Sequence, residues 1–226
     1  MSFFSKLLVL IVFVLLAGTS YVAAKCGDPP KFDSSEIVRM TCALIEEVVA
    51  ESYPELRGRE FKIEIFNSES TFFKTRFSFT KLLTFRRAVF IVGVNPKAFE
   101  SGASKDALRA IIAHELAHAD LFRTNGGFKA FGMIGLLNAR SLAKFERRAD
   151  LVAIEKGYGH GLKAYREWLY KNVPKKYLAK KMRNYFSPTE IELILFARSV
   201  NSDIISKLMK DVPLSLVETK AATENK

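Results

Sequence analysis

Two of the only three histidines in the 226-residue chain, His114 and His118, are four positions apart in a strongly helical segment. Residues 104–122 contain no Gly or Pro, are rich in Ala and Leu, and open with Ser104 as the predicted N-cap. Four residues of an α-helix turn by about 400°, so both imidazoles project from one side, one turn apart. Both rings can then bind a single zinc ion at about 2.0–2.1 Å, which predicts a metal site inside the protein.

The same helix carries an apolar stripe of Leu108, Ile112 and Leu116, and the histidines lie about a third of a turn from it. Only a narrow strip of the helix therefore faces water. Glu115, between the histidines, is placed to accept a proton from a metal-bound water as general base. The alternative interpretation is a buried helix whose histidines only hydrogen-bond to neighbouring groups.

A catalytic zinc site needs three protein ligands and an open fourth position, so a third donor is required. Glu146 and Asp150 are four residues apart on a second predicted helix, on a face that is otherwise apolar. Buried carboxylates need a partner, which favours a role at the metal. Two alternatives stay open: both acids could pair with arginines on a solvated face, or His160 could be the third ligand.

His-Glu-x-x-His followed by Glu-x-x-x-Asp resembles the gluzincin metallopeptidases, and the stretch 146–154 is similar to the family of the CAAX prenyl endopeptidases and their bacterial heat-shock relatives. The resemblance covers the two predicted active-site helices, under a quarter of the chain. It implies that His114, His118 and Glu146 are the zinc ligands, that Glu115 is the general base, and that Asp150 holds a ligand histidine.

These residues together predict a zinc-dependent peptidase that hydrolyses peptide bonds with a metal-activated water. A hydrogen-bond donor for the oxyanion is also expected, and the candidates are Tyr158, His160, Arg183 and Tyr185. Two other functions remain open. One is a non-catalytic zinc or cell-envelope binding module, and the other is a zinc amidase that acts on a non-protein substrate.

The N-terminus has the pattern of a secretory signal: Lys6, an apolar run over 7–17, and small residues before a predicted cleavage after Ala24. We therefore expect an exported, periplasmic or extracellular protein. The alternatives are an uncleaved anchor over 7–24 or lipidation at Cys26, although Lys25 stands where a lipoprotein signal needs a small residue.

The mature chain would keep two cysteines, Cys26 and Cys42, and the second lies in a helix predicted over Ser34–Ser52 with Asp33 as its cap. In an oxidising compartment the two could form a disulfide worth roughly 3 kcal/mol. The alternative is that Cys42 is simply a core residue.

Residues 25–212 are predicted to form one zincin-like α+β domain, rich in helices, with a small mainly antiparallel sheet. The expected strands are 61–66, 72–79 and 88–94, and which of them forms the edge stays open. We also expect a cleft wall or lid over 128–137, a helix over 162–170 and a capping box at Ser187–Glu190. Residues 213–226 are expected to be a flexible tail.

The formal net charge of +11 favours anionic partners. A basic patch is predicted at Lys175, Lys176, Lys180, Lys181 and Arg183. We expect a polypeptide substrate and contact with an anionic surface or polymer through this patch. Nucleic acid is not an expected partner, because export removes the usual target and no recognition motif occurs. Membrane anchoring is expected only if the N-terminal segment stays uncleaved.

Overall fold

The computed structural model describes residues 24–25, 34–77, 89–124 and 138–224. Residues 1–23 of the predicted leader, Cys26 and the predicted lid over 128–137 lie outside these residues. Cys42 is buried in the first described helix. None of the helices in the described ranges combines the length and the hydropathy needed to cross a bilayer.

The sheet has the strand order β1-β2-β4-β3, with β1 (Ala24–Lys25), β2 (Phe61–Ile65), β3 (Phe73–Phe77) and β4 (Phe90–Val94). β1 pairs antiparallel with β2, and β3 pairs antiparallel with β4, whereas β2 and β4 are parallel. The sheet is therefore mixed, with antiparallel pairing in the majority. This confirms the predicted α+β class and makes β3 an edge strand among the described residues.

The helices make up most of the described chain. They are α2 (Ser34–Ser52), the short 3₁₀ helix η1 (Pro54–Leu56), α4 (Lys97–Glu100), α5 (Lys105–Thr124), α7 (Ala139–Glu155), α8 (Gly159–Asn172), α9 (Lys175–Asn184), α10 (Pro188–Val200), α11 (Ile204–Lys210) and α12 (Leu216–Glu224). The predicted bounds of α2 agree with the structure, and the predicted capping box of α10 is present at Ser187 and Glu190.

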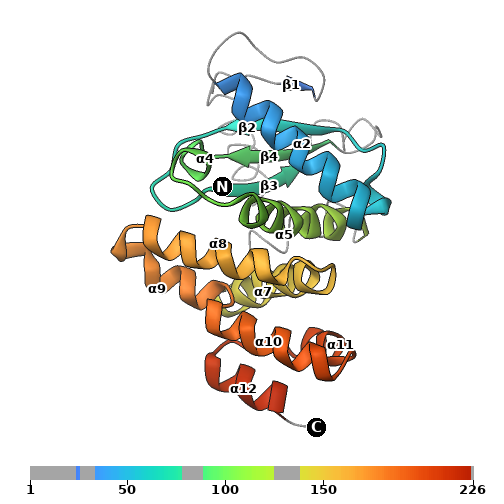
Figure 1. The fold of residues 1–226 in the computed structure, drawn as a ribbon, viewed down its shortest axis with the longest axis vertical. Coiled ribbons are helices and arrows are strands. Elements are labelled where there is room, and N and C mark those ends of the chain that lie inside the picture. Colours follow the sequence, from blue (N-terminus) through green and yellow to red (C-terminus); the bar gives the residue numbers. More distant parts are fainter. Residues whose placement is uncertain (1–23, 26–33, 78–88, 125–137, 225–226) are drawn as a thin grey trace, which may run out of the picture.

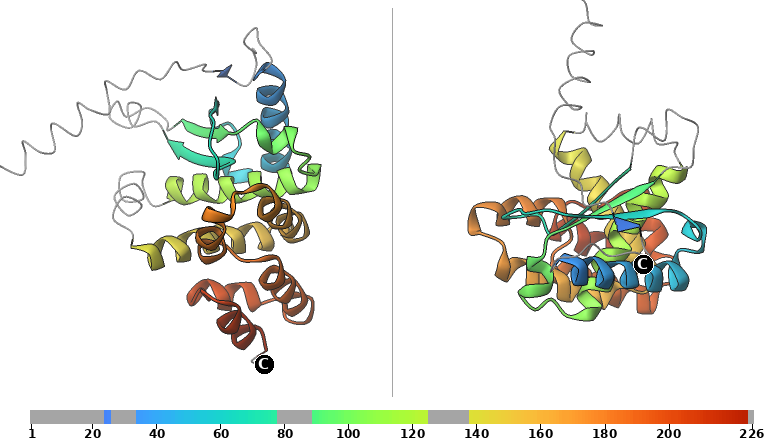
Figure 2. Two further views of the ribbon diagram at one scale, coloured as in Figure 1. Left: turned by 90° about the vertical axis from the view of Figure 1, so that its left-hand side faces the viewer. Right: turned by 90° about the horizontal axis from the view of Figure 1, so that it is seen from above.

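α5 occupies the centre of the molecule (Figures 1 and 2). It contacts α2 and β3 on one side and α7 and α8 on the other. The left view of Figure 2 shows the sheet, α5, the α7–α8 layer and the C-terminal helices in succession. The helix is capped as predicted, because the backbone N–H of Ala107 donates to the Ser104 hydroxyl at 3.2 Å. A helix in this position has little exposed surface, which places its histidines in the interior.

Small residues allow α8 to pack closely against α5. Ala110 and Ala113 of α5 are fully buried, and Gly161 of α8 lies against the first turn of α5. A Cβ atom at Gly161 would overlap with the backbone carbonyl oxygen of Asp106. The close approach brings the side chains of α8 within reach of the histidine helix.

The expectation of a flexible tail over 213–226 is wrong for most of its length, because Leu216–Glu224 form α12. Thr219 is completely buried, and its hydroxyl donates to Oε1 of Glu190 at 3.1 Å. The same carboxylate accepts a hydrogen bond at 2.7 Å from the buried guanidinium of Arg147, which also donates to the carbonyl of Pro213. Composition alone suggested a solvated tail, but a buried ion pair on α7 and α10 supplies partners for its polar groups.

Candidate metal centre

The two histidines of α5 point to the same side of the helix, as their spacing predicts. The Nε2 atoms of His114 and His118 are 3.2 Å apart, and both residues are buried, with 2% and 7% of their surface exposed. The ring of His118 stacks on Phe145 of α7, with centroids 4.5 Å apart. The ring of His118 is therefore held by packing on an element outside its own helix.

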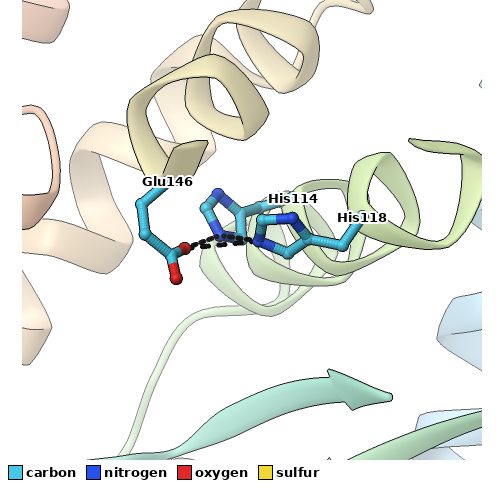
Figure 3. Close-up of side chains that lie close together, drawn as sticks. All are labelled: His114, His118 and Glu146. Carbon is cyan, nitrogen blue, oxygen red and sulfur yellow. Dashed lines mark hydrogen bonds and ion pairs between the residues drawn. The ribbon is translucent and has the colours of Figure 1, made fainter. Parts of the chain in front are cut away.

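α7 adds the third donor atom. Oε2 of Glu146 lies 3.3 Å from Nε2 of His114 and 3.3 Å from Nε2 of His118. Figure 3 shows the carboxylate of Glu146 directed toward both rings. The three atoms form an almost equilateral triangle. A tetrahedral centre with ligands at 2.0–2.1 Å requires edges of about 3.3–3.4 Å, so this triangle has the dimensions of a zinc site. The same three residues are the group that could hold a metal ion within the described part of the chain.

Asp150, one turn after Glu146 on α7, supports His114 from the opposite side of the ring. Its Oδ1 atom lies 2.8 Å from Nδ1 of His114 and also accepts a hydrogen bond of 2.6 Å from Arg166 of α8. Its Oδ2 atom accepts from the backbone N–H of Phe186 at 3.1 Å. A carboxylate on Nδ1 fixes the tautomer that leaves the Nε2 lone pair for a metal.

Electrostatics keep Glu146 and Asp150 ionised. Burial opposes their charge, but the charge of Arg166 holds the pKa of Asp150 below its usual value. Hydrogen bonds from the two histidines likewise hold the pKa of Glu146 far below its usual range against the effect of burial. Burial also opposes charge on His114, yet its hydrogen bonds to Asp150 and Glu146 raise its pKa to about 9. One proton can bridge only two of the three donor atoms, whereas a divalent cation accepts from all three.

A cavity of about 20 Å³ opens beside His114. Its polar lining includes Glu115, Arg166, Lys181 and Tyr185, and Phe73 at the start of β3 forms part of its apolar wall. A cavity of this volume holds about one water molecule. Glu115, only 5% exposed, therefore shares a water-sized space with a donor of the metal group.

The four candidates for oxyanion stabilisation lie in different places, and Tyr185 is the one that lines this cavity. The Tyr158 hydroxyl donates to Glu51 of α2 at 3.0 Å, away from the metal group. His160 and Arg183 are both exposed. Burial raises the pKa of Tyr185 well above 10, so its hydroxyl keeps its proton at neutral pH and can donate. The exposure of His160 also removes it as the third ligand.

Two charged residues that line the cavity, Arg166 and Lys181, were not predicted to lie at the site. Arg166 shares the buried face of α8 with Leu162 and Leu169, and an arginine at a core position of a helix was the signal that it partners a buried acid. Lys181 belongs to the basic patch predicted from the sequence. In the structure Lys180 is exposed, whereas Lys181 turns into the cavity.

No protein-family model matches the chain, and no curated protein or solved structure matches it either. The resemblance to gluzincins is therefore carried by the motif residues alone.

Proposed function

We propose that the protein is an exported zinc-dependent peptidase. The observation that carries the proposal is the triangle of His114, His118 and Glu146, with edges of 3.2, 3.3 and 3.3 Å. Beside it lie a carboxylate, Glu115, and a cavity large enough for a water molecule. Two imidazoles and one carboxylate are a ligand set of catalytic zinc sites, which keep a fourth position for water or substrate. A bound zinc ion would lower the pKa of a water and polarise a peptide carbonyl.

Glu115 is the proposed general base. It follows His114 directly on α5 and lines the cavity, so a water held there is within reach of its carboxylate. The carboxylate accepts a proton from the attacking water and then transfers it to the leaving amine. The buried position excludes bulk water from this exchange.

Tyr185 is the proposed donor to the oxyanion of the tetrahedral intermediate. Its ring centroid lies 5.9 Å from that of His114 and 4.4 Å from the guanidinium carbon of Arg166. The cation on the ring face and the packing against α5 hold the phenol in place. A pre-positioned donor of this kind typically contributes about 10²–10³ in rate.

The edge strand β3 is the proposed binding site for the peptide backbone. Its first residue, Phe73, lines the cavity, and Phe72 precedes it there. β4 pairs with one side of β3, and no described strand pairs with the other side. An extended peptide can add to such an edge by main-chain hydrogen bonds, which would carry its backbone past Glu115.

The test compares purified wild type with Glu115→Gln and Glu146→Ala, and with Glu155→Gln as a control that changes an exposed acid of α7. We expect one zinc ion per wild-type chain and hydrolysis of an unstructured protein such as casein. Glu115→Gln keeps the metal but loses turnover by at least 10²-fold, whereas Glu146→Ala loses both. Wild type that holds no zinc overturns the proposal, and zinc without turnover on any peptide favours a binding module.

We also propose that the leader is cleaved after Ala24 and that the exposed lysines of α9 contact an anionic surface or polymer. The composition of residues 1–24 and the exposure of Lys175, Lys176 and Lys180 support these two statements. N-terminal sequencing of exported protein should begin at Lys25. A start at Met1 in the membrane fraction contradicts cleavage.

A further inference from the structure

Lys181 is a charged residue of the candidate site that has no role in the proposed hydrolysis. It comes from α9, lines the same cavity as His114 and Glu115, and has a partly buried side chain. Its ammonium lies 5.5 Å from the centroid of the Tyr185 ring. Within the described ranges it forms no ion pair with a carboxylate. A lysine in such a position is costly unless something anionic meets it.

The second cation of the cavity cannot take the same role. Arg166 is 1% exposed and donates to Asp150 at 2.6 Å, so its charge is committed to the support of His114. Lys180, the neighbour of Lys181, is exposed and lies outside the cavity lining. Lys181 is therefore the cation that can meet a ligand in this cavity.

The charges around the site balance without Lys181. Glu115, Glu146 and Asp150 are three carboxylates, and Arg166 together with a bound divalent ion would supply three positive charges. Lys181 adds one positive charge that no group of the site neutralises. In a site partly screened from water, a surplus of this kind favours a ligand that brings one negative charge.

We propose that Lys181 makes the site selective for substrates with a carboxylate on a residue next to the scissile bond. The inference rests on the proposed peptidase function and names its substrate class. Lys181 lines the same small cavity, about 20 Å³, as His114 and Glu115, so a carboxylate that contacts Lys181 lies close to the reacting carbonyl. An Asp or Glu side chain and a free C-terminal carboxylate share this chemistry, and the experiment separates them.

The test measures binding to zinc-loaded Glu115→Gln protein, in which turnover is blocked. The neutral probe is an N-acetylated hexa-alanine amide. A second set of probes carries Glu at each position in turn, and a third probe ends in a free carboxylate. Calorimetric titration gives the affinity of each probe for the Glu115→Gln protein and for the same protein with Lys181→Met, Lys181→Gln, Lys181→Arg or Lys180→Met added.

We expect the best acidic probe to bind about tenfold more tightly than the neutral probe, the size of one charge-assisted contact. Lys181→Met and Lys181→Gln should bring this ratio close to one, whereas Lys181→Arg and the matched control Lys180→Met should keep it. A preference for a probe with Glu identifies a side-chain carboxylate as the ligand of Lys181. A preference for the probe with a free C-terminus identifies the terminal carboxylate. A ratio unchanged by Lys181→Gln overturns the inference, as does an equal loss in Lys180→Met.

The two proposals fail in different ways. Hydrolysis of peptides without any acidic preference contradicts only the inference about Lys181. Acidic probes that bind through Lys181 without hydrolysis of any peptide by wild type contradict only the peptidase.

Discussion

Nδ1 of His114 lies 2.8 Å from Oδ1 of Asp150, a carboxylate with no exposed surface. The pair joins α5 to α7, and Arg166 extends the connection to α8. Three helices thus determine which nitrogen of the His114 ring carries the proton and where the other nitrogen points. The geometry of the candidate metal group depends on this contact as much as on the ligands themselves.

Asp150→Asn should lower zinc affinity about 10- to 100-fold. An amide can donate to Nδ1, which favours the tautomer with the proton on Nε2 and removes the lone pair needed by the metal. Competition with a chelator of known affinity measures the change. Glu155→Gln, an exposed acid of the same helix, is the control and should bind zinc like wild type. Equal affinities of Asp150→Asn and wild type would show that Asp150 does not orient the ligand.

Arg166→Met should destabilise the fold by about 3–5 kcal/mol, because it leaves the buried charge of Asp150 without its ion-pair partner. Urea unfolding of the metal-free proteins measures the free energy of unfolding. Arg140→Met, which removes an exposed arginine of α7, should change it by less than about 0.5 kcal/mol. A loss below about 1 kcal/mol for Arg166→Met would mean that the ion pair contributes little.

Zinc affinity should rise with pH up to about 9, where the pKa of His114 lies. This pKa is raised above the unfolded value, so in the metal-free protein the protonated ring stabilises the fold below about pH 6.5, and that contribution is lost as pH rises through 9. Metal binding must displace the proton. Calorimetry at pH 7 in buffers of different ionisation enthalpy should detect release of about one proton per zinc ion. Binding that is independent of pH between 7 and 9 contradicts the prediction.

Thr219→Val should cost about 1–3 kcal/mol, because it removes a buried hydroxyl that donates to Glu190, the ion-pair partner of Arg147. Thr223→Val is the matched control on α12, since its hydroxyl donates only to backbone carbonyls of the same helix and is less buried. Thermal unfolding compares the two variants. Equal melting temperatures of the two variants would mean that the contact of Thr219 with Glu190 does not stabilise the packing of α12.

The sequence by itself determined the parts of the site that local geometry controls. The spacing of His114 and His118 on a helix fixes their common direction. The spacing of Glu146 and Asp150 likewise puts both acids on one face of α7. The side-chain caps that begin helices, such as Ser187 of α10, could likewise be predicted from the sequence. These features depend on residues within one or two turns of each other.

Only the tertiary structure decided what depends on contacts between distant segments. It brought Glu146 within 3.3 Å of both histidines, paired Arg166 with Asp150, and turned Lys181 into the cavity while Lys180 faces out. It also placed β3 at the edge of the sheet. Thr219 of α12 contacts the buried ion pair of Arg147 and Glu190. From composition alone, Arg, Lys and a polar tail are expected to face solvent. A charge that is distant in sequence can nevertheless supply the partner that makes their burial favourable.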